Sequence, residues 1–245
     1  MRLRVIDIET TGGSPSEIIE IAAVDVVDTS GGWRAEAPHS RLFRPAGQIS
    51  FHAMAIHHLT PEDFDDDLPS CSEGLLNDFV LSNHRPDFLI AHNSAFESQH
   101  IPAAVTDGLE WICTVKGARN AWPDAPGYSN QVLRYWRGLK LASSLAMPPH
   151  RAGPDAWVTA HILIDLLRTV SVHDLIGWTH APRRLDRVPF GRYRGQEWTI
   201  PPNDYLRWLV GEPDMSDDVL ARARKELADR ELSSTRLTEE QTHQA

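Results

Sequence analysis

The first part of the chain has the hydrophobic and polar pattern of strands. Residues 3–8 (LRVIDI) alternate and end in the turn-forming cluster TTGGSPS. Residues 17–27 (EIIEIAAVDVV) and residues 38–44 (PHSRLFR) form two further runs of this kind. Because the connections between the three runs are short, the pattern predicts an antiparallel meander at the start of the fold.

After this meander the hydrophobic period changes to that of helices alternating with strands. Thr60, Pro61 and the two acids that follow have the cap and first turn of a helix. The order βββ followed by αβαβα predicts an α/β fold, with a mixed five-stranded sheet flanked by helices. We expect helices at 73–82, from Phe96, at 128–138 and at 155–170, and strands at 87–92 and 111–115.

The composition of the chain changes near residue 178. We expect the sheet domain to span 1–178 and to be followed by a small module at 179–232 that contains PFGRYRGQEW and DYLRWLV. One more helix is predicted at 216–231, and residues 233–245 are expected to form a frayed tail.

Composition narrows the possible classes of protein. The 245 residues include 34 acids and 24 Lys or Arg, which gives a net charge of −10. This balance argues against a protein that coats nucleic acid by bulk positive charge and against a binder of anionic membranes. The only two cysteines, Cys71 and Cys113, form no disulfide framework. With no signal-peptide pattern and no apolar run near 18 residues, a cytoplasmic protein is expected.

Two acids in the first predicted strand are the first candidate site. Asp7 and Glu9 lie two positions apart, so both side chains point to the same face of the strand. Two carboxylates beside a glycine-containing turn can share a hard divalent cation. The alternative is a pair of acids on a solvated face, but the apolar neighbours Val5, Ile6 and Ile8 indicate a central strand.

Two later segments add a third and a fourth acid. In residues 90–98 (IAHNSAFES) a strand gives way to a helix whose first turn contains Glu97, which is also a favourable place for a purely structural acid. In residues 150–156 (HRAGPDA), His150 lies in a loop and Asp155 begins a helix. A histidine near a metal-bound water is a natural base near neutral pH.

Taken together, the order and spacing of these segments resemble a known family. DIETTG at 7–12, HNSAFE at 92–97 and His-x4-Asp at 150–155 are similar to the three motifs of the DEDDh (DnaQ-like) 3′→5′ exonucleases. Further segments resemble the bacterial exodeoxyribonuclease X subfamily, so that the resemblance covers roughly residues 3–210. They are residues 45–60, 110–122 and 128–133, FGRYRG and YLRWL.

The resemblance implies an RNase H-like fold and metal-dependent hydrolysis at DNA 3′ ends, single-stranded or frayed. Asp7 would bridge two Mg²⁺ or Mn²⁺ ions, Glu9 and Asp155 would bind one of them, and Glu97 would serve the other. His150 would act as the general base. The residues implied for substrate binding are Thr10, Thr11, Gly12, Met54, Ile56, His57, Asn93 and Phe96, of which Asn93 and Phe96 are expected chiefly to position the second motif.

One residue departs from the family pattern. The second motif normally ends in Asp, whereas this chain has Glu97, whose longer arm can displace an ion that requires near-ideal octahedral geometry. Three outcomes stay open: an active enzyme, an enzyme with reduced or Mn²⁺-dependent activity, and a nucleic-acid-binding homologue without activity. An exoribonuclease or oligoribonuclease is a further alternative, because no residue identifies a contact to a 2′-hydroxyl.

The C-terminal module differs in charge from the rest of the chain. Between His180 and Val210 there are six arginines and three acids, +6 − 3 = +3, interleaved with tyrosines and tryptophans. Arginines among aromatic rings are typical of a groove that follows phosphates and stacks bases, so the module is expected to bind DNA. The alternative is a small aromatic core surrounded by solvated arginines. The charged residues are Arg183, Arg184, Arg187, Arg192, Arg194, Arg207, Asp186, Glu197 and Asp204.

Overall fold

The structure is a computed structural model that describes residues 1–82, 84–182, 185–212 and 215–243. The chain forms two compact units, Met1–His180 and Ala181–Ala245. The sequence placed the boundary after residue 178. No helix in the described ranges is long and apolar enough to cross a membrane.

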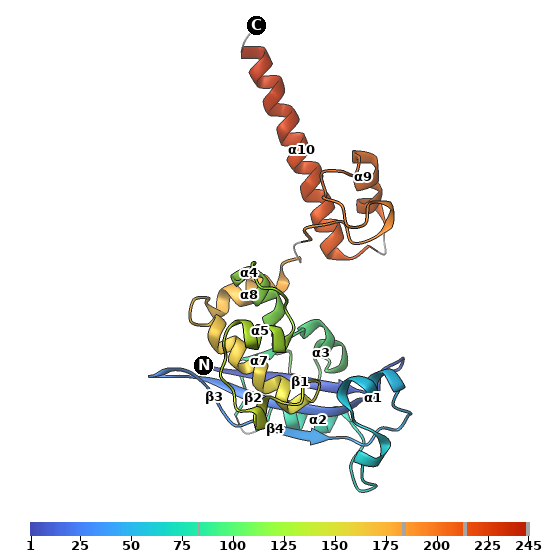
Figure 1. The fold of residues 1–245 in the computed structure, drawn as a ribbon, viewed down its shortest axis with the longest axis vertical. Coiled ribbons are helices and arrows are strands. Elements are labelled where there is room, and N and C mark those ends of the chain that lie inside the picture. The colour runs from blue at the N-terminus through green and yellow to red at the C-terminus, as the bar shows by residue number, and fades with distance from the viewer. Residues whose placement is uncertain (83, 183–184, 213–214, 244–245) are drawn as a thin grey trace. The chain divides into compact units, whose positions relative to one another are not determined.

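A mixed sheet lies at the centre of the first unit (Figure 1). β1 pairs antiparallel with β2 and parallel with β5, which in turn pairs parallel with β6. The α/β class is confirmed, but the described residues contain six strands rather than five. The additional strand, β3, has only four residues, too few to show an alternating pattern. The strands are β1 (Arg2–Thr10), β2 (Ile18–Thr29), β3 (Gly32–Ala35), β4 (His39–Leu42), β5 (Phe88–Ala91) and β6 (Trp111–Cys113).

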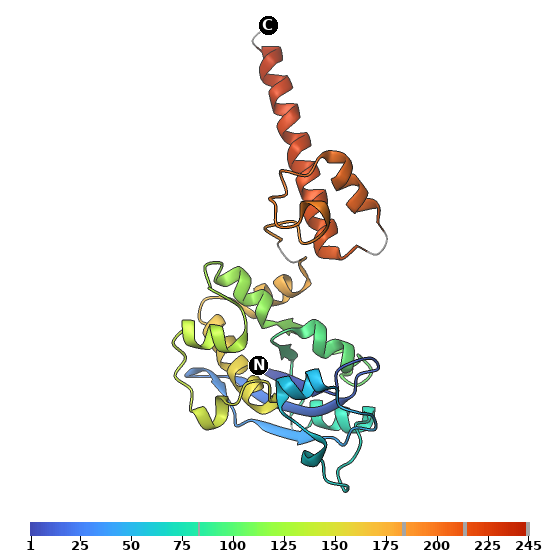
Figure 2. The ribbon, with the colours of Figure 1, turned by 45° about the vertical axis from the view of Figure 1, so that its right-hand side comes forward.

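Helices cover both faces of this sheet. The long helix α7 packs on β1 and β2, as Figures 1 and 2 show. It shares one hydrophobic core with α4, α5 and α8. α2 packs against the opposite face. The helices are α1 (Phe51–His57), α2 (Glu73–Val80), α3 (Ser94–His100), α4 (Thr114–Ala121), α5 (Asn130–Trp136), α6 (Ser143–Ala146), α7 (Ala152–Leu166) and α8 (Val172–His180), with a 3₁₀ turn at Pro61–Asp63.

Two helices next to the candidate site differ from the sequence prediction. α1 was not predicted; Ser50 caps it by accepting a hydrogen bond from the Ala53 backbone N–H at 3.1 Å. α7 begins at Ala152, three residues before the predicted start at 155. Pro154 therefore lies in its first turn, where a missing N–H costs nothing.

Alternation along β1 divides its side chains between the two cores. Leu3 and Val5 belong to the core beneath α7, whereas Ile6 and Ile8 belong to the core beneath α2. Because side chains alternate along a strand, Asp7 and Glu9 continue the row of Leu3 and Val5. The two acids therefore face α7 at the carboxyl end of β1.

At its other end, β1 carries a buried ion pair. Arg4 is fully buried, and its Nε and Nη2 atoms each donate to the carboxylate of Asp25 on β2 at 2.7 Å. Arg4 Nη1 also donates to the carbonyl oxygen of Val80, at the end of α2. Burial alone would raise the pKa of Asp25, but hydrogen bonds from Arg4 and Arg2 outweigh it, so that this pKa lies below its usual value.

The second unit has a separate small core. It contains a 3₁₀ turn at Gly191–Tyr193, α9 (Asn203–Gly211) and α10 (Asp217–His243). In the structure α10 continues to His243, through a segment without Pro or Gly that was expected to belong to a tail at 233–245. Residues 244 and 245 lie outside the described residues, as do Arg183 and Arg184 of the predicted basic segment. The core is formed by Val188, Trp198, Leu206, Leu209, Val219 and Ala223.

Candidate active site

Three carboxylates from two elements meet at the end of β1. Asp7 and Glu9 of β1 and Asp155 of α7 each offer one oxygen, and these oxygens lie within 4.8 Å of one another. Asp155 is buried, and the two strand acids are half-buried. The alternation of β1 and the first turn of α7 therefore bring together acids that are almost 150 residues apart in sequence.

Glu97 lies nearby but outside this group of three. It is buried in the first turn of α3, directly after β5, the parallel neighbour of β1. Among the described residues, its Oε2 atom has no hydrogen-bond partner, and the same is true of Asp155 Oδ1. Each orphaned oxygen is costly to bury unless something not contained in the protein chain satisfies it.

Burial and mutual repulsion favour the protonated forms of these acids. Burial is the main cause that raises the pKa of Glu9 and of Glu97 to about 8. Burial also raises the pKa of Asp7 well above its usual value, helped by the charges of Asp155 and Glu97. The pKa of Asp155 is raised by burial as well. A multivalent cation would reverse this preference by favouring the ionised carboxylates.

The donor set fits a divalent metal ion. Hard cations such as Mg²⁺ and Mn²⁺ prefer carboxylate oxygens. The site combines clustered carboxylates with two buried oxygens that no other described residue satisfies. Asp7, Glu9 and Asp155 are the residues that would hold such an ion directly. Glu97 is placed to serve a neighbouring position.

His150 lies beside these acids, on the exposed loop that precedes α7. Its backbone is left-handed, with φ of 59°, and its N–H donates to Asp155 Oδ2 at 2.8 Å. This hydrogen bond fixes the loop to the first turn of α7 while leaving the other Asp155 oxygen unused. The imidazole therefore stands on a backbone that is anchored directly to an acid of the cluster.

The sequence analysis missed an ion pair that holds this loop in place. Glu20 pairs with Glu9 in the β1–β2 register and is buried. Its carboxylate accepts hydrogen bonds from Nε and Nη2 of Arg151, both at 2.9 Å, and from the backbone N–H of Ala152 at 3.0 Å. Glu20 thus caps α7 and orients the His150 loop. An acid within the apolar run EIIEIAAV was the available signal.

The turn after β1 is built mainly by internal contacts. Thr11 is buried, and its Oγ1 accepts a hydrogen bond from Glu17 N–H at 3.0 Å. Gly12 has φ of 66°, and a Cβ there would lie 2.7 Å from Ser50 Oγ, so no other residue fits. His57 is buried, with one ring nitrogen near the Thr10 carbonyl and the other accepting from Leu59 N–H. Thr11 and His57 therefore help to build this turn, and their contact with substrate stays a prediction.

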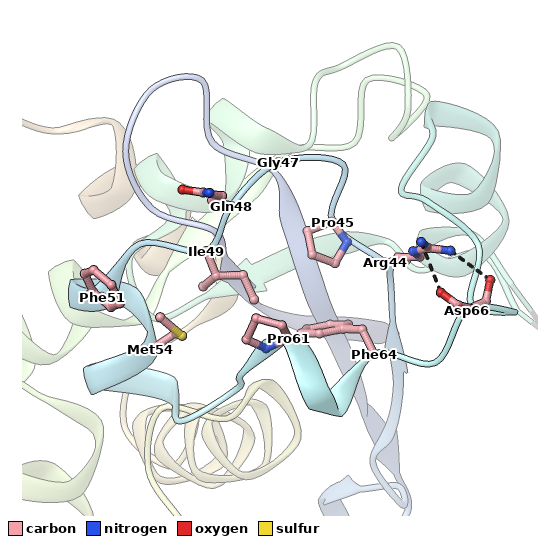
Figure 3. Close-up of a pocket in the computed structure, with 10 residues that line it drawn as sticks. All are labelled: Arg44, Pro45, Gly47, Gln48, Ile49, Phe51, Met54, Pro61, Phe64 and Asp66. Carbon is pink, nitrogen blue, oxygen red and sulfur yellow. Dashed lines mark hydrogen bonds and ion pairs between the residues drawn. The ribbon is translucent and has the colours of Figure 1, made fainter.

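The other predicted substrate residues lie on several surfaces. Met54 lines a pocket of about 540 Å³ between α1 and the 61–64 segment, shown in Figure 3. Ile56 is half exposed and does not line it. Asn93 precedes α3, and Phe96 is 37% exposed on that helix. Phe51, which was not predicted, also lines the pocket and is 88% exposed.

Comparison with known proteins identifies the family of this chain. A family model described as an exonuclease, RNase_T, matches residues 5–163. Exodeoxyribonuclease 10 of Escherichia coli strain K12 is 36% identical over 217 residues, covering 86% of this chain and 92% of the relative. The family assignment expected from the three motifs is therefore confirmed.

Solved structures of exonucleases have a similar fold. Exonuclease X in complex with 5′ overhanging duplex DNA is 35% identical, with a TM-score of 0.60 over 72% of this chain and 99% of the other. A full-length 3′-exonuclease is 18% identical, with a TM-score of 0.54 over 68% of this chain and 60% of the other, a likeness of fold alone. This chain, with its acids on β1, α3 and α7, belongs to the RNase_T exonuclease family.

Proposed function

We propose that this protein removes nucleotides from the 3′ ends of DNA by metal-dependent hydrolysis, with two Mg²⁺ or Mn²⁺ ions per site. One observation carries the proposal: Asp7, Glu9 and Asp155 converge beside a buried Glu97, and two of these carboxylate oxygens have no partner among the residues that the structure describes. The relatives support DNA as the substrate, since one is an exodeoxyribonuclease and another was solved with duplex DNA.

The roles proposed for the residues follow from their positions. Asp7, Glu9 and Asp155 would hold two divalent ions together with Glu97, which would serve the second ion directly or through water. When bound, such ions would activate a water and stabilise the leaving oxygen of an in-line phosphodiester displacement. His150 accepts a proton from the attacking water as the bond from phosphorus to the 3′ oxygen of the penultimate nucleotide breaks.

The proposal is tested with single-stranded DNA labelled at either end, in Mg²⁺, in Mn²⁺ and in chelator. Hydrolysis from the 3′ end shortens 5′-labelled strands stepwise, and it releases the label of 3′-labelled strands at once. Asp7→Ala should abolish both results, whereas Asp124→Ala, which removes an exposed acid of the same unit, should change neither. A mononucleotide released first from the 5′ end would contradict the proposed 3′→5′ polarity. Nuclease activity in Asp7→Ala would contradict the assignment of the active site.

RNA labelled in the same two ways tests the alternative substrate. Faster hydrolysis of RNA than of DNA would make the protein an exoribonuclease with the same chemistry. A folded parent protein that degrades neither polymer with either ion would instead be a nucleic-acid-binding homologue. We expect DNA to be hydrolysed faster.

A further inference from the structure

The second unit exposes one large aromatic side chain, Trp208, that its own core does not use. On α9, Leu206 and Leu209 face the core, whereas Trp208 is 49% exposed and is not among the side chains packed against that core. A large exposed indole on a small domain marks a binding surface when other groups suited to the same ligand lie around it.

Trp208 is the outer member of a row of rings. Its ring centroid lies 5.4 Å from that of Tyr205 on the same helix, and Tyr205 lies 4.7 Å from Tyr193 in the 191–193 turn. Gly191 makes this contact possible, since its φ is 70° and a Cβ would lie 2.7 Å from Tyr205 Oη. The FGRYRG and YLRWL segments, ten residues apart, thus form one surface.

Positive charge lies along the same row. The Arg192 guanidinium is 4.8 Å from the centroid of the Tyr193 ring, and it donates to the Tyr193 hydroxyl at 2.6 Å. Arg207, next to Trp208, is exposed, and its ion pair with the exposed Asp204 is 3.4 Å long. Within the described residues, the exposed side chain of Arg194 has no hydrogen-bond or ion-pair partner. These guanidinium groups can reach a phosphate without breaking a strong internal pair.

We propose that this surface, formed by Tyr193, Tyr205 and Trp208 with Arg192, Arg194 and Arg207, binds a single-stranded segment of the nucleic acid on which the first unit acts. A base can stack on the exposed Trp208 ring without regard to sequence, while the half-buried rings of Tyr205 and Tyr193 connect Trp208 to the core. The guanidinium groups neutralise the neighbouring phosphates. The inference rests on the proposed function for the identity of the strand. Holding one strand at two places raises the effective concentration of its end at the active site.

The binding test uses the full chain in chelator, with fluorescence anisotropy of a long labelled oligo(dT). Trp208→Ala should weaken binding by about 5- to 150-fold, the range that stacking of one base gives. Arg194→Gln should lower the slope of log affinity against log salt by about 0.7, the value for one phosphate contact on a single strand. Lys225→Gln removes another exposed charge of the same unit, paired with Asp229, and should leave both quantities nearly unchanged.

A second assay separates this inference from the nuclease proposal. The p-nitrophenyl ester of thymidine 5′-phosphate is too small to occupy more than the active site. Trp208→Ala should therefore hydrolyse this ester as fast as the parent does, whereas the KM of the variant for oligo(dT) should rise. Equal oligo(dT) affinity in parent and Trp208→Ala would overturn the inference, even if both hydrolyse the ester. Equal losses of affinity for single-stranded and fully duplex DNA would overturn the stacking role. A parent that binds oligo(dT) through Trp208 but hydrolyses neither substrate would instead overturn only the nuclease proposal.

Discussion

β1 carries buried charge at both ends, and the two sets of charges are built in opposite ways. At one end, Arg4 and Asp25 satisfy each other, and the pKa of Asp25 is lowered. At the other end, Asp7, Glu9 and Asp155 gather without an ion pair to any described residue, the nearby Arg151 being paired with Glu20, and burial raises the pKa of Glu9 to about 8. A buried charge with its partner holds elements together, whereas buried acids without one indicate a ligand that the chain does not supply.

The largest expected effect on stability comes from breaking the satisfied pair. Asp25→Ala leaves the Arg4 guanidinium buried and unpaired, which should lower the free energy of unfolding by about 3–5 kcal/mol. Urea denaturation measures this loss. The double variant Arg4→Met with Asp25→Val should recover most of it, because no charge is then left unpaired. A cost below about 1 kcal/mol for the single variant would show that the pair contributes little.

The unsatisfied acids should make the folded state less stable as pH rises, unless a metal ion is bound. In the folded chain the pKa values of Glu9 and Glu97 lie near 8, whereas in the unfolded chain they lie near 4.5. The folded protein therefore binds more protons between these values, and without metal its stability should fall by a few kcal/mol as pH rises from about 5 to 8. Thermal unfolding in chelator measures this trend.

Metal should reverse that loss. Mn²⁺ added at the alkaline end of the range binds the folded state and should restore the melting temperature by mass action. In Asp7→Asn, the melting temperature should fall less as pH rises and should rise less when Mn²⁺ is added. A melting temperature that stays level or rises with pH in chelator would contradict the repulsion among these acids.

A smaller effect is expected from the ion pair that connects the site to the scaffold. Arg151→Gln should lower kcat or metal affinity by about 10- to 100-fold, as loss of a contact behind metal ligands does. Arg151→Lys keeps the charge but loses the bidentate geometry, so its activity should be intermediate. Arg168→Gln, at the other end of the same helix, is the matched control. If activity and metal titration are unchanged in Arg151→Gln, the pair has no positioning role.

The smallest change is expected at Glu97. Glu97→Asp shortens the arm by one methylene, and it should alter activity only severalfold, mainly by changing the ratio of rates in Mg²⁺ and Mn²⁺. Rates measured with each ion in parent and variant test this. A parent inactive with both ions, together with an active Glu97→Asp, would show that the longer side chain had disabled the site.

Local pattern was enough to predict much of this molecule. Alternation placed Asp7 and Glu9 on one face, and strand-to-helix transitions placed Glu97 and Asp155 in first turns. These features depend only on neighbours in the chain. The strand β3 was not predicted, because four residues are too few to show a periodic pattern.

Features that depend on tertiary contacts could not be predicted in the same way. The role of Glu20 follows from its register opposite Glu9 and from the approach of Arg151, which is 131 residues further along the chain. The burial of His57 follows from α1, which was not predicted and which brings the ring against Thr10 and Leu59. Such assignments require the positions of elements that are distant in sequence.

The alternation of side chains along β1 limits how this enzyme can change in evolution. Asp7 and Glu9 share the row of Leu3 and Val5, so deleting or inserting one residue before Asp7 would turn both acids toward the core of Phe79 and Val80. Such a change would abolish folding together with chemistry. Inactive descendants that keep the fold should therefore arise by substitution at the acids, with the length of β1 unchanged.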